Sequence, residues 1–126
     1  MQVNFIENAP AAIGPYCHAV TVGNLLFCSG QTPLDPATMQ LVGSDIGTQT
    51  ERVLMNLSVV LNGMGLTLQN VVKTSVFLQD MADFQGMNAV YARMFGDHRP
   101  ARTTVAVKQN PLGALVEIEC IAEIKS

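Results

Sequence analysis

Apolar residues recur along the 126-residue chain at two different spacings, which separate helical from extended segments. Between residues 44 and 64 they recur at steps of three and four, so they share one face of a helix. Ser44 opens this predicted helix, and Gly63 and Gly65 end it, because glycine is common at helix C-termini. The apolar face is formed by Ile46, Val53, Leu54, Leu57, Val60, Leu61 and Met64.

A second segment with helical spacing follows between residues 80 and 96. Asp80 or Asp83 can cap its N-terminus, and Gly96 stops it. We expect the helix to pack through a buried side made of Phe84, Met87, Tyr91, Met94 and Phe95.

The other apolar segments have the alternation or the β-branched content of strands. Residues 18–22 and 25–29 flank the turn signal Gly23-Asn24 and predict a hairpin. A short extended segment precedes the loop at 7–16 and is expected to form the first strand. Three further strands are expected at 71–79, 102–108 and 115–124. The resulting order, β-β-β-α-β-α-β-β, predicts an α+β fold with two helices on one face of a mixed sheet.

Composition adds expectations about size and assembly. The length fits one domain, residues 1–126. Hydrophobic residues make up 48% of the chain and charged residues only 13%, against about 25% in typical domains. So little charge leaves apolar surface to be covered, which favours an oligomer. The net charge of −3 and the scattered basic residues argue against nucleic acid as a partner.

The sequence lacks the motifs that metal binding and nucleotide binding require. The three cysteines, Cys17, Cys28 and Cys120, have no C-x-x-C spacing, and His18 and His98 belong to no metal-binding pattern. We therefore expect no metal. No nucleotide-binding motif is present, so no nucleotide cofactor is implied. Free thiols and the lack of a secretory leader or a long apolar run predict a cytoplasmic protein without a membrane anchor.

The last predicted strand carries three glutamates on one side. Alternation places Glu117, Glu119 and Glu123 on one face, and the apolar residues of the strand on the other. One interpretation is an acidic face in contact with water. The other is that one glutamate lies in a cleft, where partial burial raises its pKa and suits it to acid/base chemistry.

Arg102 begins the preceding strand, after Pro100 and beside the hydroxyls of Thr103 and Thr104. A guanidinium held by a restricted backbone can donate two parallel hydrogen bonds to a carboxylate. Arg102 is therefore a candidate clamp for an acidic ligand. The alternative is an arginine that forms an ordinary surface salt bridge.

Two small-residue segments complete the candidates. Tyr16 follows Gly14-Pro15 and could contact a ligand or pack within the hairpin. Ser29-Gly30 ends a strand, where small side chains let a ligand approach the backbone. Ser29 lacks the G-x-S-x-G context of a nucleophile elbow.

These segments carry a resemblance that runs nearly end to end. The chain resembles the Rid family of reactive intermediate deaminases, also known as YjgF or RidA and historically as L-PSP endoribonucleases. The matching motifs are N-A-P-A-A-I-G-P-Y at 8–16, S-G-Q at 29–31, V-K-T-S-V-F at 72–77, N-A-V-Y at 88–91, P-A-R-T-T-V at 100–105 and V-E-I-E-C-I-A at 116–122.

The resemblance implies a chorismate-mutase-like α+β fold and a homotrimer with a barrel-like centre and clefts between subunits. It also implies a cofactor-free deaminase for 2-iminobutanoate and 2-iminopropanoate. Such an enzyme hydrolyses reactive enamine and imine acids, including 2-aminoacrylate and 2-aminocrotonate, to 2-keto acids and ammonia.

By position in the family, Arg102 would bind the substrate carboxylate and Glu117 would orient or activate the attacking water. The cleft would be lined by Tyr16, Ser29, Gly30 and Asn88. The turn at 96–99 is shorter than in some relatives, and we expect this difference to affect the cleft rim and the substrate preference.

Two other functions are compatible with such a site. The cleft could sense 2-keto acids or amino acids and regulate a partner, although a carboxylate sensor has no need for Glu117. The older family label suggests an endoribonuclease, against which the acidic charge balance counts.

Overall fold

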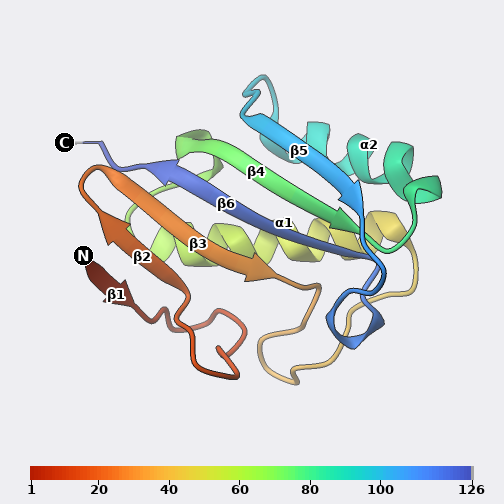
Figure 1. The fold of residues 1–126 in the computed structure, drawn as a ribbon, viewed down its shortest axis with the longest axis horizontal. Coiled ribbons are helices and arrows are strands. Elements are labelled where there is room, and N and C mark those ends of the chain that lie inside the picture. Colours follow the sequence, from red (N-terminus) through yellow and green to blue (C-terminus); the bar gives the residue numbers. More distant parts are fainter. Residues whose placement is uncertain (126) are drawn as a thin grey trace.

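The sheet is organised around the C-terminal strand. In the computed structural model, which describes residues 1–125, six strands pair in the order β1-β2-β3-β6-β4-β5 (Figure 1). Only β4 and β5 are parallel, so the sheet is mixed, as predicted. The strands are β1 (Gln2–Asn4), β2 (Ala19–Val22), β3 (Leu25–Gln31), β4 (Val71–Leu78), β5 (Ala101–Ala106) and β6 (Val116–Glu123).

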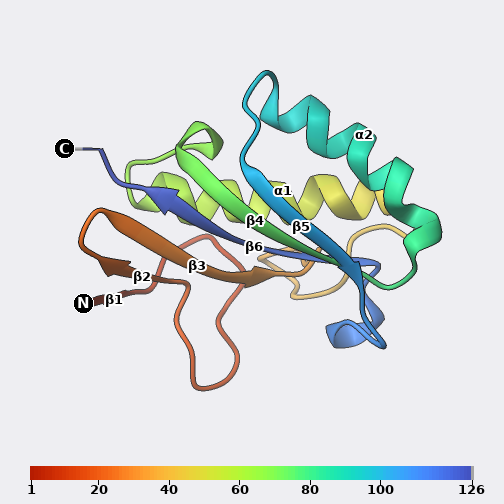
Figure 2. The same cartoon turned by 45° about the horizontal axis from the view of Figure 1, so that its top comes forward.

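Two helices, α1 (Ile46–Gly63) and α2 (Phe84–Phe95), lie on the same face of the sheet and leave the other face open (Figures 1 and 2). The predicted order of elements and the one-sided helix layer are thus confirmed. Three single turns of 3₁₀ helix, at Leu68–Asn70, Met81–Asp83 and Pro111–Gly113, complete the chain.

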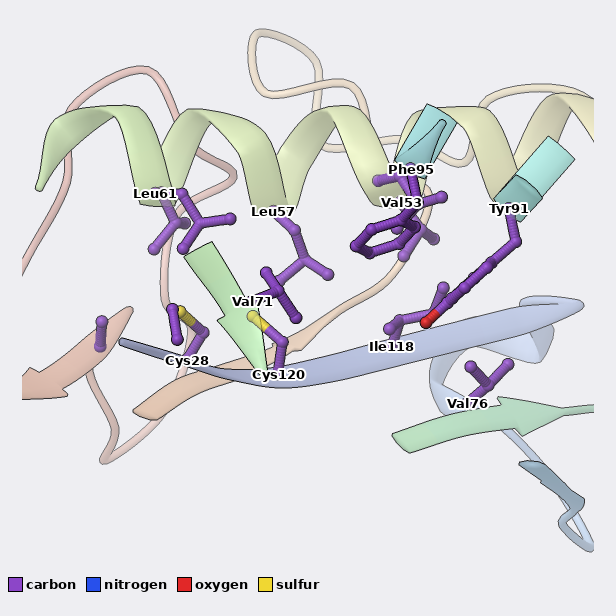
Figure 3. Close-up of a cluster of buried hydrophobic side chains, with 14 of the residues drawn as sticks. Cys28, Val53, Leu57, Leu61, Val71, Val76, Tyr91, Phe95, Ile118 and Cys120 are labelled. Carbon is purple, nitrogen blue, oxygen red and sulfur yellow. The ribbon is translucent and has the colours of Figure 1, made fainter. Parts of the chain in front are cut away.

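The core fills the space between α1 and the covered face of the sheet (Figure 3). The apolar stripe of α1 is fully buried at Val53, Leu54, Leu57, Val60 and Leu61. From the sheet, it meets the inward residues of β4 and β6, which include Val71, Val76, Ile118 and Cys120. The predicted helical period therefore marks the residues that form the core.

Helix α1 begins later than the prediction, which had Ser44 open it. Asp45 is its N-cap, and the Asp45 carboxylate accepts a hydrogen bond of 2.9 Å from the backbone N–H of Thr48. Aspartate at this position satisfies a helix amide that has no partner inside the helix, so the first helical residue is Ile46.

The C-terminus of α1 is terminated by Gly65 rather than by Gly63. Gly65 has a φ of 76° and donates to the carbonyl of Asn62, while Leu66 donates to the carbonyl of Leu61. This is the Schellman arrangement, which needs a left-handed residue and so favours glycine. Gly63 is still helical, and its missing side chain makes room for Ile6.

The start of α2 uses both predicted aspartates. Asp80 caps the 3₁₀ turn that precedes α2 and accepts a hydrogen bond from Ala82, whereas Asp83 occupies the N-cap of α2 without a side-chain bond. Gly96, with a φ of 65°, ends the helix as predicted. Its buried side is Met87, Tyr91 and Phe95, with Phe84 and Met94 packed at the margin.

Strand β6 separates two chemically different faces. Its residues Val116, Ile118, Cys120 and Ala122 are buried beneath the helices. The glutamates Glu117, Glu119 and Glu123 alternate with them and lie on the open face, as the alternation predicted. Within residues 1–125, no helix has the length and apolarity needed to cross a bilayer.

Candidate active site

Arg102 lies on the edge strand β5 and points to the helix side of the sheet. Its Cα pairs with that of Thr74 on the neighbouring strand β4, and Thr74 is buried beneath α2, where its hydroxyl lies 2.7 Å from the hydroxyl of Tyr91. Because paired residues of adjacent strands share a face, Arg102 projects toward α2 as well.

The guanidinium of Arg102 rests on aromatic side chains of α2. Its central carbon lies 4.8 Å from the centre of the Tyr91 ring and 5.6 Å from that of Phe84. Nη1 also contacts the sulfur of Met87 at 3.9 Å. Cation–π attraction of this kind is worth about 0.5–2 kcal/mol per pair. These contacts hold the guanidinium in place and do not neutralise its positive charge.

The positive charge of Arg102 also affects the pKa of Tyr91. Burial raises the pKa of Tyr91, and the hydrogen bond with Thr74 and the nearby Arg102 oppose that rise. Tyr91 is therefore a neutral phenol near neutral pH, which supports the arginine and does not pair with it as an anion.

Within the described residues, no carboxylate pairs with Arg102. Among residues 1–125, the one ion pair joins Arg93 to Glu51, with 2.8 Å between Nη2 and Oε2. The alternative interpretation of Arg102, an ordinary surface salt bridge, is thus wrong for the described chain. Arg102 borders a pocket of about 250 Å³ whose lining is Asn88, Tyr91, Ala92, Arg99, Pro100 and Arg102.

Asn88 adds an acceptor to this region, which we name the arginine half-site: Asn88, Tyr91 and Arg102. The side-chain oxygen of Asn88 is buried and has no hydrogen-bond partner within residues 1–125. A buried polar atom without a partner costs free energy unless a ligand, water or a second chain satisfies it.

Glu117 lies on the open face, opposite Phe77 in the register of β4 and β6. Its side chain is half-buried. Burial raises the pKa of its carboxyl above the usual value of 4.5, and repulsion from Glu119 raises it further. Desolvation and a like charge both disfavour the anion. The carboxyl is therefore suited to exchange a proton closer to neutrality than a solvated glutamate.

A β-bulge brings Gly30 against Glu117. Cys28 pairs with Cys120 and Gln31 with Ile118, so Ser29 and Gly30 together face the single residue Glu119. A Cβ placed on Gly30 would lie only 2.8 Å from Oε2 of Glu117. Because Gly30 has no side chain, the carboxylate of Glu117 can occupy this space.

The loop before β2 holds Tyr16 beside this bulge. Tyr16 and Gly30 line one small cavity, and the hydroxyl of Ser29 donates a 2.7 Å hydrogen bond to the carbonyl of Cys17. We name Tyr16, Ser29, Gly30 and Glu117 the glutamate half-site. Ser29 is thus a structural link within it and keeps oxygen lone pairs for a ligand.

His18 anchors the same loop, a role that the sequence did not reveal. The backbone N–H of Ile6 donates to its Nδ1 at 2.9 Å, and its Nε2 donates to the carbonyl of Pro10 at 2.8 Å. His18 is buried. Both ring nitrogens are used, so this histidine holds the loop that presents Tyr16.

One chain does not bring the two half-sites together. Arg102 faces α2, whereas Glu117 faces the open side of the same sheet. The residues expected to act together are therefore divided into two groups, one on each face. The sequence missed the aromatic support of Arg102 by Tyr91 and Phe84, because it assigned both side chains to the buried side of a helix.

The cysteines and histidines form no metal site within the described part of the chain. Cys28 and Cys120 are buried neighbours in the core on the covered face (Figure 3). Their mutual hydrogen bond and burial raise the pKa of the Cys120 thiol, which disfavours the reactive thiolate. Cys17 is half-buried beside Tyr16.

The fold and the half-sites define a small α+β protein with an arginine that pairs with no carboxylate among residues 1–125 and a carboxyl of raised pKa. The family model described as Endoribonuclease L-PSP matches residues 6–124. The chain therefore belongs to this family, which is also the Rid family of the YjgF and RidA proteins.

Similar proteins cover nearly the whole chain. A RutC family protein of Pyrococcus horikoshii is 49% identical over 96% of both chains. Reactive Intermediate Deaminase A, chloroplastic, of Arabidopsis thaliana is 45% identical over 94% of this chain and 63% of its own length. The crystal structure of E. coli TdcF with bound serine superposes with a TM-score of 0.93, at 34% identity, covering 99% of this chain and 100% of that one.

Proposed function

We propose that this protein hydrolyses small 2-imino acids, and the enamines from which they form, to 2-keto acids and ammonia. The observation that carries the proposal is the unpaired guanidinium of Arg102, held on Tyr91 and Phe84 and facing a small pocket. A planar guanidinium with free donors suits a planar carboxylate. The Arabidopsis relative is a reactive intermediate deaminase, and serine, a 2-amino acid, is bound to the E. coli relative.

The reaction needs only water. An enamine such as 2-aminoacrylate first tautomerises to 2-iminopropanoate. Water then adds to the carbon of the C=N bond, and the resulting carbinolamine expels ammonia and leaves the keto group. In this scheme, Arg102 holds the carboxylate next to the reacting carbon, while Glu117 takes a proton from the water and returns it to the departing nitrogen. General acid–base help of this kind contributes about 10²–10⁴-fold, enough for a bond that also hydrolyses unaided.

The proposed site forms between two subunits of a homotrimer. This part of the proposal is supported by the position of the two half-sites on opposite faces of one sheet. Because they do not meet within one chain, the half-site of one subunit has to be completed by that of a neighbouring subunit. The open face of the sheet also carries exposed apolar side chains, and the trimer would cover them around a barrel-like centre. They are Val3, Val22, Leu25, Phe27 and Val105.

The direct test generates 2-aminoacrylate with a serine dehydratase and traps the imine with semicarbazide. The protein is expected to lower the yield of trapped product, and Arg102→Met is expected to abolish that effect because methionine keeps the packing but removes the charge. Arg93→Gln is the matched control, because that arginine is exposed and pairs with Glu51. Equal trapping with and without the protein would refute the proposal.

Two further measurements separate the other functions. Saturable binding of 2-ketobutyrate without any turnover of imine would instead indicate a sensor of keto acids. Cleavage of RNA that persists through purification and disappears in Arg102→Met would support the endoribonuclease label. The chain's net charge of −3 leads us to expect neither tight RNA binding nor cleavage.

A further inference from the structure

A second arginine, Arg99, lines the same pocket as Arg102. It belongs to the turn between α2 and β5, directly before Pro100. Nothing in the hydrolysis of a simple imine such as 2-iminopropanoate requires it, because such a substrate has one carboxylate and Arg102 suffices to bind it.

Among the described residues, no acidic side chain lines this pocket. Its other lining residues, Asn88, Tyr91, Ala92 and Pro100, are neutral, and Tyr91 stays protonated near neutral pH because burial raises its pKa. Neither arginine has a carboxylate within 4 Å among residues 1–125. Two arginines thus line one small pocket in a chain whose net charge is −3.

The structure holds Arg99 in place at this rim. Nη1 of Arg99 donates to the carbonyl of Gly96 and, at 3.0 Å, to that of His98. His98 is itself fixed, since its Nε2 lies 2.6 Å from the carbonyl oxygen of Val71. Both bonds of Arg99 use the same nitrogen, so the guanidinium retains donors on Nη2 and Nε.

We propose that Arg99 binds a second, side-chain carboxylate of the substrate, so that the enzyme prefers imines of acidic amino acids, such as 2-iminosuccinate and 2-iminoglutarate. This inference rests on the proposed imine hydrolysis and names its substrate class. Arg102 holds the carboxylate next to the imine, and Arg99 holds the one at the far end. Within one chain, this pocket of about 250 Å³ leaves room for a small dicarboxylate.

The chemistry of the reacting carbon is unchanged by this assignment. Water adds to the C=N bond and ammonia leaves, so 2-iminosuccinate gives the four-carbon 2-keto diacid. The second carboxylate takes no part in bond making. It adds attraction that a monocarboxylic imine lacks, and Arg99 is therefore a specificity-determining residue.

The competing role for Arg99 is structural. Its bonds to Gly96 and His98 neutralise carbonyls at the C-terminal end of α2, where a cation is favourable. A structural role lowers stability when it is lost and affects every substrate alike. A role in specificity changes the ratio between diacid and monoacid substrates.

The kinetic test compares two imines made in situ by amino-acid oxidases in the presence of catalase. Aspartate yields 2-iminosuccinate and alanine yields 2-iminopropanoate, and the decay of each is followed by semicarbazide trapping. For Arg99→Gln we expect kcat/KM to fall about tenfold or more for 2-iminosuccinate and to stay within about twofold for 2-iminopropanoate. Arg102→Gln is expected to lower both, and Arg93→Gln neither.

An equal fall for both imines, or no fall for 2-iminosuccinate, would overturn the assignment of Arg99. Inactivity of the wild type on both imines would instead count against the proposed hydrolysis. A binding measurement then decides the assignment by itself. We expect succinate to bind more tightly than butyrate by calorimetry, with the preference lost in Arg99→Gln and kept in Arg93→Gln. No preference in the wild type refutes the inference.

Discussion

Replacement of Gly30 by alanine tests how the glutamate half-site is built. The added Cβ would stand 2.8 Å from Oε2, 3.0 Å from Cδ and 3.2 Å from Cγ of Glu117. An ordinary contact begins at 3.4 Å, so the carboxylate has to move by about 0.6 Å. The φ of Gly30 lies outside the left-handed region, so alanine introduces no backbone strain there.

The displacement predicts a catalytic defect in a folded protein. A misplacement of about 1 Å at a reacting group can cost about 10²-fold in rate. For a shift of about 0.6 Å, we expect kcat for imine hydrolysis to fall about tenfold. KM is expected to change little, because Arg102, which we propose binds the carboxylate, lies on the other face of the sheet.

The assay is the semicarbazide-trapping rate at several imine concentrations, with the melting temperature measured in parallel. Gly47→Ala is the control glycine: its added Cβ would lie 3.3 Å from Oδ2 of Asp45 and 3.7 Å from a methyl group of Val90, and neither residue belongs to a half-site. In a Glu117→Gln background, Gly30→Ala should cost little more, because both changes disable one carboxylate. Full activity of Gly30→Ala, or strict additivity with Glu117→Gln, would refute the reasoning.

Two further predictions concern the same half-site. Burial raises the pKa of Glu117 above 4.5, and in the proposed mechanism its anion takes the proton from water. Activity should therefore fall as pH drops, with a midpoint above 4.5 that Glu117→Gln removes. A midpoint at or below 4.5, after subtraction of unaided hydrolysis, would contradict this. His18→Ala leaves the part-buried N–H of Ile6 and the buried carbonyl of Pro10 without partners, so unfolding in urea should show a loss of about 2–4 kcal/mol. A loss below about 1 kcal/mol would exclude the anchoring role.

Local patterns in the sequence were sufficient for the elements and for the composition of their faces. The steps of three and four residues between 44 and 64 correspond to the buried side of α1, and the alternation of β6 separates its glutamates from the core. Such patterns are reliable because they depend only on the geometry of a helix or a strand. The position of a helix cap depends on a single hydrogen bond. For that reason the N-cap of α1 is Asp45, whereas the prediction had Ser44 open the helix.

The candidate residues were also visible in the sequence, but their roles required more than local spacing. An arginine at a strand start can pair with a carboxylate of its own chain or wait for one from a ligand. In the structure, Tyr91 and Phe84 support Arg102 from a helix that the sequence could assign only to a buried side, and within residues 1–125 no carboxylate pairs with the guanidinium. Contacts between distant segments are set by packing, which no local period encodes.

By itself, then, the sequence determined two helices, the strands and the two charged groups, Arg102 and Glu117. Only the tertiary structure decided that these groups lie on opposite faces of one sheet. Side chains alternate along each strand, so the sequence shows which residues of one strand share a face. The relation between two strands depends on their register, and strand β6 acquires its register by pairing between β3 and β4, far from it in the chain.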